Sequence, residues 1–173
     1  MELGVILPNS GAFADPQAIL AVAEAAEALG YDALWTADHL VLPIETQTNY
    51  PYVRGAKIRL DPKHAFFEPL IALAAVATKT TRIRLGISVY LAALRHPIAV
   101  AKQVASLDRL SNGRMILGVG AGWIPEEYET LGIPFAHEAV SVFSTFDRFR
   151  AINPVVKAPT LVCDDGETIM DSS

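Results

Sequence analysis

Short, mostly apolar segments alternate with segments of helical spacing over the first 131 residues, and this alternation limits the chain to few folds. The apolar segments, typical of strands that are buried on both faces, are residues 3–7, 32–36, 82–90 and 115–119. The segments of helical spacing are residues 16–29, 69–79, 97–111 and 123–131. Strands that alternate with helices predict parallel βαβ units and therefore an α/β fold.

Right-handed crossovers leave two architectures for such a chain: a β/α barrel or an open, doubly wound sheet. In both, ligands bind at the carboxyl ends of the strands. All four expected strands end in polar or glycine-containing turns, which are residues 8–11, 36–39, 88–90 and 120–122. The sequence therefore predicts a ligand site at this edge of the sheet.

His39 follows Asp38 at the end of the second expected strand. A histidine beside a carboxylate can exchange protons near neutral pH, which makes His39 a candidate catalytic residue. The alternative is that Asp38 caps the following loop and His39 is structural. Gly118, Gly120 and Gly122 are open to two interpretations as well: a turn that holds a phosphate, or a tight turn between strand and helix.

Other polar positions have structural interpretations. Glu126 and Glu127 fall in the first turn of an expected helix, where carboxylates interact favourably with the helix dipole. Arg95 and His96 precede a proline at a helix start, and His64 lies in the long irregular stretch of about residues 40–63. His, Cys, Asp and Glu show no metal-ligand spacing, so we expect no metal site.

Composition narrows the function classes. The formal net charge is −5, the pI is about 5.3 and there is no basic run, which argues against nucleic-acid binding. The single cysteine, Cys163, rules out a disulfide within this sequence. Neither a basic leader nor a long apolar run is present, so we expect a soluble, cytoplasmic protein without a membrane span.

The last forty or so residues differ from the rest. Residues 137–151 have the spacing of a helix, residues 160–163 are typical of a strand, and the acidic residues 164–173 are expected to fray. We therefore divide the chain into a β/α domain over residues 1–135 and a divergent helix and acidic tail over residues 136–173.

Taken together, the strand ends resemble those of the bacterial luciferase-like superfamily, and more narrowly its deazaflavin-dependent oxidoreductases. The segments that carry the resemblance are residues 7–11, 29–39, 81–86, 95–97 and 110–123. Tyr50-Pro51-Tyr52 and residues 131–135 add to the narrower match. In the superfamily's sugar-phosphate dehydrogenases a glutamate follows the glycine turn, whereas this chain has Trp123 there, which argues against that activity.

The resemblance implies a (β/α)8 TIM-type barrel, of which this chain supplies about four βα units, since a whole barrel takes about 250 residues. It implies that coenzyme F-420, a deazaflavin, or else FMN binds at the carboxyl ends of the strands. The ring would lie over a non-proline cis peptide between Ser88 and Val89. His39 would face the substrate as a proton donor or orienting group. The remaining residues expected near the cofactor are Asn9, Asp38, Gly120 and Gly122.

Three functions follow from this resemblance. The first is hydride transfer between coenzyme F-420 and a small organic substrate, and the second is an FMN-dependent monooxygenase. The third is a truncated, non-catalytic half-barrel that forms a homo-oligomer, because a half-barrel exposes strand edges and an apolar interior.

Overall fold

Four parallel strands form the central sheet of the computed structural model, which describes residues 1–44, 47–48, 61, 63–135, 146–152, 160–162 and 168–170. The strands are β1 (Gly4–Ile6), β2 (Ala33–Thr36), β3 (Arg84–Tyr90) and β4 (Met115–Val119), and they are hydrogen-bonded in the order β1-β2-β3-β4. The register places Val5 opposite Leu34, Leu34 opposite Leu85 and Ile87 opposite Leu117.

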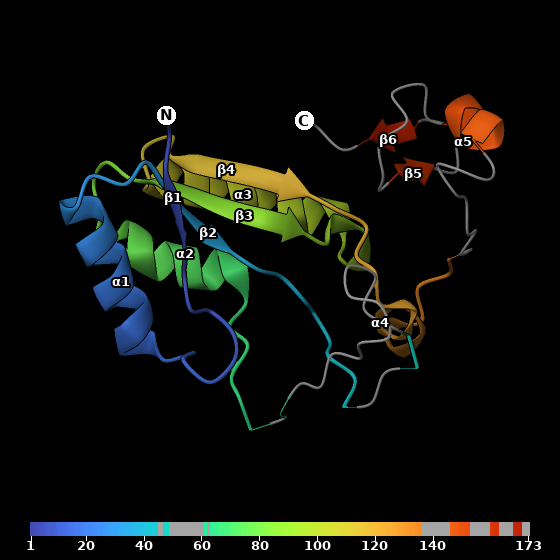
Figure 1. Cartoon of the computed structure of the whole chain (residues 1–173), viewed down its shortest axis with the longest axis horizontal. Coiled ribbons are helices and arrows are strands. Elements are labelled where there is room, and N and C mark those ends of the chain that lie inside the picture. The colour runs from blue at the N-terminus through green and yellow to red at the C-terminus, as the bar shows by residue number, and fades with distance from the viewer. Residues whose placement is uncertain are drawn as a thin grey trace.

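The strand order decides between the two architectures. Sequential parallel strands with right-handed crossovers place every helix on one side of the sheet, whereas a doubly wound sheet reverses its strand order and carries helices on both faces. Helices α1 (Pro16–Ala28), α2 (Pro69–Ala77) and α3 (Pro97–Leu110) cover the same face (Figure 1). The predicted partial barrel is therefore confirmed.

Helices α1, α2 and α3 begin at the residues that the sequence predicts, and the fourth helix begins at Pro125, two residues after its predicted start. The Asp15 carboxylate accepts hydrogen bonds from the backbone N–H groups of Gln17 and Ala18, and Pro16 takes the first helical position of α1. Helix α4 (Pro125–Leu131) ends at Gly132, which has a φ of 65°. A glycine suits this position because the left-handed conformation is unfavourable for other residues.

The core lies between the sheet and helices α1, α2 and α3. Its fully buried members include Leu34, Leu73, Leu85 and Ile87. All of them are aliphatic, and three come from the strand face that points toward the helices. Burial of each such side chain stabilises the fold by about 1.5–3 kcal/mol.

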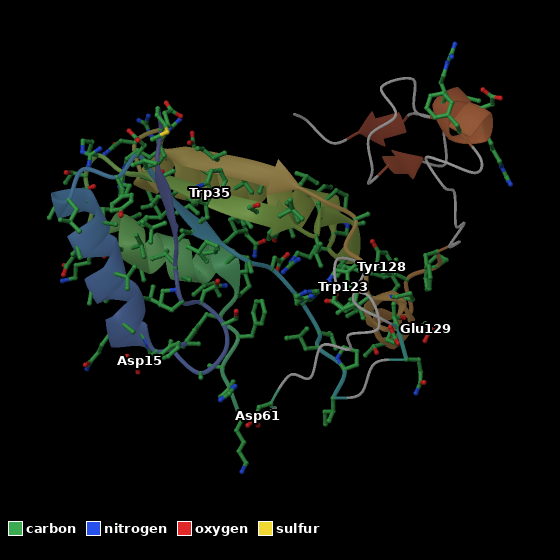
Figure 2. All side chains as sticks on the ribbon, viewed as in Figure 1. Asp15, Trp35, Asp61, Trp123, Tyr128 and Glu129 are labelled. Atoms are coloured by element: carbon green, nitrogen blue, oxygen red, sulfur yellow. The ribbon has the colours of Figure 1, made fainter. Side chains whose placement is uncertain are left out.

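The other face of the sheet corresponds to the interior of a barrel, and Trp35 lies across it (Figure 2). A Cβ atom on Gly4 would approach Trp35 Nε1 to 2.5 Å, and one on Gly86 would approach Trp35 Cε3 to 2.4 Å. Glycine on both flanking strands therefore makes room for the indole. The Ile6 side chain lies on the same face of the sheet and is 77% exposed.

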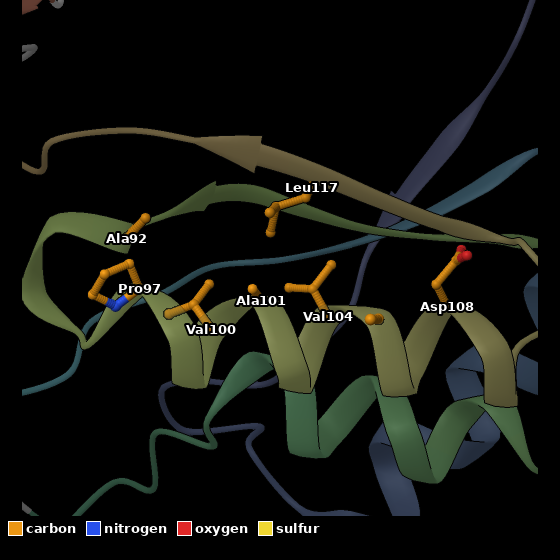
Figure 3. Close-up of a pocket in the computed structure, with 8 residues that line it drawn as sticks. Ala92, Pro97, Val100, Ala101, Val104, Asp108 and Leu117 are labelled. Atoms are coloured by element: carbon orange, nitrogen blue, oxygen red, sulfur yellow. The ribbon is translucent and has the colours of Figure 1, made fainter.

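A groove of about 500 Å³ lies between α3 and strand β4 (Figure 3). Its lining is mostly aliphatic and includes Val100, Val104 and Leu117. In a β/α barrel, the helix that follows a strand packs beside the preceding helix. Helix α4 instead lies near the carboxyl ends of the strands (Figure 1), so the groove occupies the place of a helix following β4.

The C-terminal part contains α5 (Phe146–Ile152) and a two-stranded antiparallel sheet of β5 (Thr160–Val162) and β6 (Thr168–Met170). The predicted strand at 160–163 is confirmed over 160–162. The predicted helix at 137–151 is confirmed over 146–151, the part of it that the structure describes. The expectation that residues 164–173 fray is wrong for 168–170, because Thr168 and Ile169 are β-branched and pair with β5. Cys163 and Tyr50-Pro51-Tyr52 lie outside the described residues.

The boundary between the β/α domain and the divergent C-terminal segment, placed between residues 135 and 136, stays a prediction. No helix within the described ranges is long and apolar enough to cross a membrane.

Candidate functional site

The His39 imidazole lies at the carboxyl edge of the sheet and contacts a buried carboxylate. Its Nδ1 atom is 2.7 Å from Oε2 of Glu127, on α4. The His39 side chain is 17% exposed and that of Glu127 is 1% exposed. Because β2 ends at Thr36, His39 belongs to the turn that follows the strand, where parallel α/β folds place their ligands.

Glu127 also holds the backbone beyond His39. Its Oε1 atom accepts hydrogen bonds from the N–H groups of Leu40 at 3.1 Å and Val41 at 3.3 Å. One carboxylate therefore fixes both the imidazole and the chain that carries it. Neighbouring Glu126 binds the same loop farther along, at the N–H groups of Gln47 and Thr48.

Two aromatic rings lie against the imidazole. Phe66 and Trp123 approach His39 edge to face, with centroid separations of 5.8 and 6.4 Å. Trp123 lies two residues before the start of α4, and Tyr128 lies on that helix (Figure 2). Apolar walls on two sides limit the access of water to the imidazole and restrict the orientations of its ring.

Asp38 makes different contacts from those of His39. Both of its oxygens bind Arg95, at 2.7 Å to Nη1 and 2.8 Å to Nη2, and Oδ2 accepts from Leu91 N–H at 2.8 Å. The side chain of Asp38 is fully buried, and that of Arg95 is 10% exposed. Burial opposes ionisation of Arg95, but the contact with Asp38 outweighs it and raises the pKa of the guanidinium.

Two more side chains surround Arg95. The guanidinium lies 4.3 Å from the centre of the Tyr90 ring, a cation–π contact. A carboxylate oxygen of Glu68 is 3.7 Å from Nη2. Burial raises the pKa of Glu68 although Ile71 N–H and Arg95 both act to lower it. Asp38, Arg95 and Glu68 thus join the ends of β2 and β3 to the start of α2.

Asn9, after β1, is buried and uses its amide to join backbone segments. Nδ2 donates to the carbonyls of Ala37 and Phe67, at 2.9 and 3.1 Å, and Oδ1 accepts from Ala37 N–H at 3.1 Å. The amide therefore sets the spacing between the ends of β1 and β2. A direct contact between Asn9 and a cofactor stays a prediction.

The end of β3 has the backbone feature that the family resemblance implies. The peptide bond between Ser88 and Val89 is cis, and the pairing with β4 shifts between Ile87 and Tyr90. Gly120, after β4, lies against this bulge: a Cβ atom there would come within 2.4 Å of Val89 Cγ2. The contact favours the interpretation of the glycine segment as a tight turn.

A cavity of about 330 Å³ opens at the same edge. It is lined by Ile6, Trp35, Thr36, Ala37 and Ser88. Cavities that bind small molecules usually measure about 300–1,000 Å³ and combine apolar walls with a few polar groups. The cavity therefore has room for a planar heterocycle beside the exposed Ser88.

Contacts link the predicted site residues to one edge of the sheet. Asn9 binds Ala37, next to Asp38; Asp38 binds Leu91, and a Cβ atom on Gly122 would touch that leucine at 3.3 Å. Gly120 contacts Val89. Cofactor binding by Asp38, Ser88, Val89, Gly120 and Gly122 stays a prediction, as does catalysis by His39. Among the described residues no cluster of His, Cys, Asp and Glu could hold a metal ion.

Glu127 and Arg95 are site residues that were not predicted from the sequence. The helix-dipole interpretation of Glu127 is incomplete, because its carboxylate points at His39 rather than only toward the helix start. One signal was available: Glu127 falls three residues after Ile124 and four before Leu131, on the apolar stripe of the helix. A carboxylate on a buried stripe requires partners. For Arg95, which lies 57 residues after Asp38, we find no such signal.

Comparison with known proteins places these observations in a family. The model of the luciferase-like monooxygenase family matches residues 1–142. A shorter stretch, residues 128–173, matches the model of the glutathione S-transferase N-terminal domain. An uncharacterized protein of Mycobacterium tuberculosis is 37% identical over 131 residues, which cover 76% of this chain and 46% of that protein. The chain spans about half the length of the curated relatives it matches.

Solved structures show the same fold. The oxygenating constituent of 3,6-diketocamphane monooxygenase from Pseudomonas putida, in complex with FMN, has a TM-score of 0.60 and 19% identity, covering 100% of this chain and 45% of that one. An F-420-dependent secondary alcohol dehydrogenase in complex with an F-420–acetone adduct has a TM-score of 0.57 and 21% identity, covering 99% and 47%.

Proposed function

Because the chain belongs to the luciferase-like monooxygenase family, we propose that it takes part in hydride transfer between coenzyme F-420 and a small organic substrate. The observation that carries this proposal is the contact between His39 and Glu127 at the carboxyl edge of the sheet. With Nδ1 engaged, Nε2 is the ring nitrogen left to face a substrate.

The residues at the edge suit a planar ring. Ser88 is exposed and lines the cavity, and Gly120 keeps the neighbouring turn close to Val89. Trp35 and Ile6 supply apolar surface on the same side. When bound, a deazaflavin supplies or accepts a hydride, which is two electrons and one proton.

His39 then supplies the proton that the reduction of the substrate requires. As a carbonyl carbon gains the hydride, its oxygen gains negative charge, and the protonated imidazole donates a proton to it. The products are an alcohol and a neutral imidazole, and the reverse reaction uses the neutral imidazole as a base. Glu127 keeps the imidazole oriented in both directions, while Phe66 and Trp123 limit the access of water.

FMN-dependent oxygenation is the second candidate. The similarity of the fold to that of a monooxygenase solved in complex with FMN supports it. Titration of the purified chain with F-420 and with FMN, followed by fluorescence, discriminates the two. Saturable binding of F-420 without oxygen uptake supports hydride transfer. Oxygen uptake that requires FMN would contradict hydride transfer and support the FMN-dependent monooxygenase.

The exposed interior face favours a further proposal about assembly. Among the described residues, the outer edges of β1 and β4 pair with no other strand, and Ile6, on the interior face, is 77% exposed. A second copy related by a twofold axis along the barrel would pair β1 with β4 in parallel and cover the Ile6 side chain. Light scattering at micromolar concentration should show a dimer that Ile6→Glu dissociates, and a monomeric wild type would contradict this proposal. The cytoplasmic location stays a prediction.

A further inference from the structure

The geometry points to a specific task for Glu127, which we propose is the positioning residue that fixes the proton of His39 on Nδ1. This inference rests on the proposed function only for its catalytic consequence. The proton position itself is a property of the free protein and can be measured without cofactor or substrate.

The hydrogen-bond pattern around the carboxylate determines the direction of the contact. Oε1 accepts from two backbone N–H groups, those of Leu40 and Val41, which can only donate. Oε2 lies 2.7 Å from Nδ1, a distance typical of a charge-assisted hydrogen bond. An ionised carboxylate has no hydrogen to donate, so Nδ1 must be the donor.

The consequence falls on the other ring nitrogen. In a neutral imidazole only one nitrogen carries a hydrogen. If that hydrogen is on Nδ1, then Nε2 presents a lone pair and acts as a base. If the ring is protonated, Nε2 presents an N–H group and acts as an acid. Glu127 therefore lets one nitrogen of His39 serve hydride transfer in both directions.

Glu127→Gln should reverse this arrangement while changing the shape of the side chain very little. The amide oxygen would keep the two hydrogen bonds from Leu40 and Val41, because an NH₂ group there would face two donors. The NH₂ group would then replace Oε2 and donate to Nδ1 of His39. The neutral imidazole would carry its hydrogen on Nε2, which is the wrong tautomer for a base at that position.

Glu126→Gln is the matched control. Glu126 lies in the same first turn of α4 and binds the N–H groups of Gln47 and Thr48 from the same loop. Its hydrogen bonds are to that loop and not to an imidazole. This substitution removes one charge from the same helix turn and should leave the His39 tautomer unchanged.

The test is ¹⁵N NMR of the full chain labelled at histidine, in mildly alkaline solution, with the His39 signals assigned by comparison with His39→Gln. The chain has four histidines, so the spectrum is simple. We expect Nδ1 of His39 to carry the hydrogen in the wild type and in Glu126→Gln, and Nε2 to carry it in Glu127→Gln. A wild type with the hydrogen on Nε2 overturns the inference without any variant, and so does a folded Glu127→Gln that keeps it on Nδ1.

Kinetics adds the catalytic consequence. Glu127→Gln should lower kcat about 100-fold or more and leave KM within about threefold, because the substrate site is intact and the proton is misplaced. An equal loss in Glu126→Gln would contradict the positioning role. A wild type that binds neither F-420 nor substrate, with the expected tautomers, would contradict the proposed function alone.

Discussion

Arg95 and Asp38 form a bidentate ion pair at the carboxyl edge of the sheet, with N–O distances of 2.7 and 2.8 Å. The pair joins the end of β3 to the turn that carries His39, although its members are 57 residues apart in sequence. The position of the candidate catalytic histidine therefore depends on this pair as well as on Glu127.

Removing one partner of this pair should destabilise the fold strongly. In Asp38→Asn the buried guanidinium of Arg95 loses the nearer of its two counter-charges and keeps only Glu68, at 3.7 Å, so we expect the free energy of unfolding to fall by about 3 kcal/mol. Urea denaturation measures the change. Glu2→Gln is the control, because its ion pair with Arg84 is exposed to solvent and should contribute little to stability. Equal effects in both variants would contradict the account.

Tyr90→Phe should be neutral or stabilising. The Tyr90 hydroxyl is buried and has no hydrogen-bond partner in the described part of the chain, so removing it relieves an unsatisfied polar group. We expect a change in unfolding free energy between zero and a gain of about 1 kcal/mol. Tyr128→Phe is the matched control, since that hydroxyl donates to the Ala121 carbonyl and its loss should cost about 1 kcal/mol. A marked loss in Tyr90→Phe would reveal a partner for the hydroxyl.

Glu27 should make the free energy of unfolding depend on pH in the acidic range. Burial opposes its ionisation, but hydrogen bonds from the N–H groups of Ile83, Arg82 and Thr81 outweigh this effect and lower its pKa to about 2. A carboxyl whose pKa is lower in the folded state stabilises the fold above its ordinary pKa of 4.5, and this contribution disappears as pH falls toward about 2.

Glu27→Gln tests this linkage. Because the carboxyl is partly solvated, we expect a loss of about 1–2 kcal/mol at neutral pH and a difference from the wild type that shrinks below pH 4.5. Thermal melts across this pH range measure it. Exposed Glu24, on the same helix, provides Glu24→Gln as the charge-matched control. A constant difference at every pH would mean that the charge is not responsible.

His39→Ala should reduce turnover far more than it reduces cofactor affinity, because the imidazole is proposed to act on the substrate. We expect kcat to fall by about 10²–10⁴-fold, the usual contribution of a general acid or base, with little change in F-420 affinity. Exposed His64 supplies the control substitution His64→Ala. Parallel losses of turnover and affinity in His39→Ala would identify a structural histidine.

Local signals predicted most of the fold. Asp15, Pro16 and Gly132 mark helix ends through interactions within a few residues, and the strands follow apolar runs of suitable length. The barrel architecture also needed the strand order, which only the structure supplies. The cis peptide at Ser88–Val89 followed from the family resemblance and from no local pattern.

The site was harder to predict because its contacts join distant segments. His39 and Glu127 are 88 residues apart, and the local sequence around Glu127 predicted only a favourable interaction with the helix dipole. The fit of Trp35 between Gly4 and Gly86 likewise depends on three strands at once. Strand β6 was missed because pairing with β5 outweighed the acidic composition of its surroundings.

Titration of the purified chain with F-420 is the decisive experiment, because we propose that a deazaflavin binds at the strand ends around His39 and Ser88. We expect saturable quenching of F-420 fluorescence, and we expect Gly120→Val to weaken binding at least tenfold, because a side chain there would collide with Val89, the neighbour of Ser88 in the cavity lining. Absence of saturable F-420 binding by the folded wild type would contradict it.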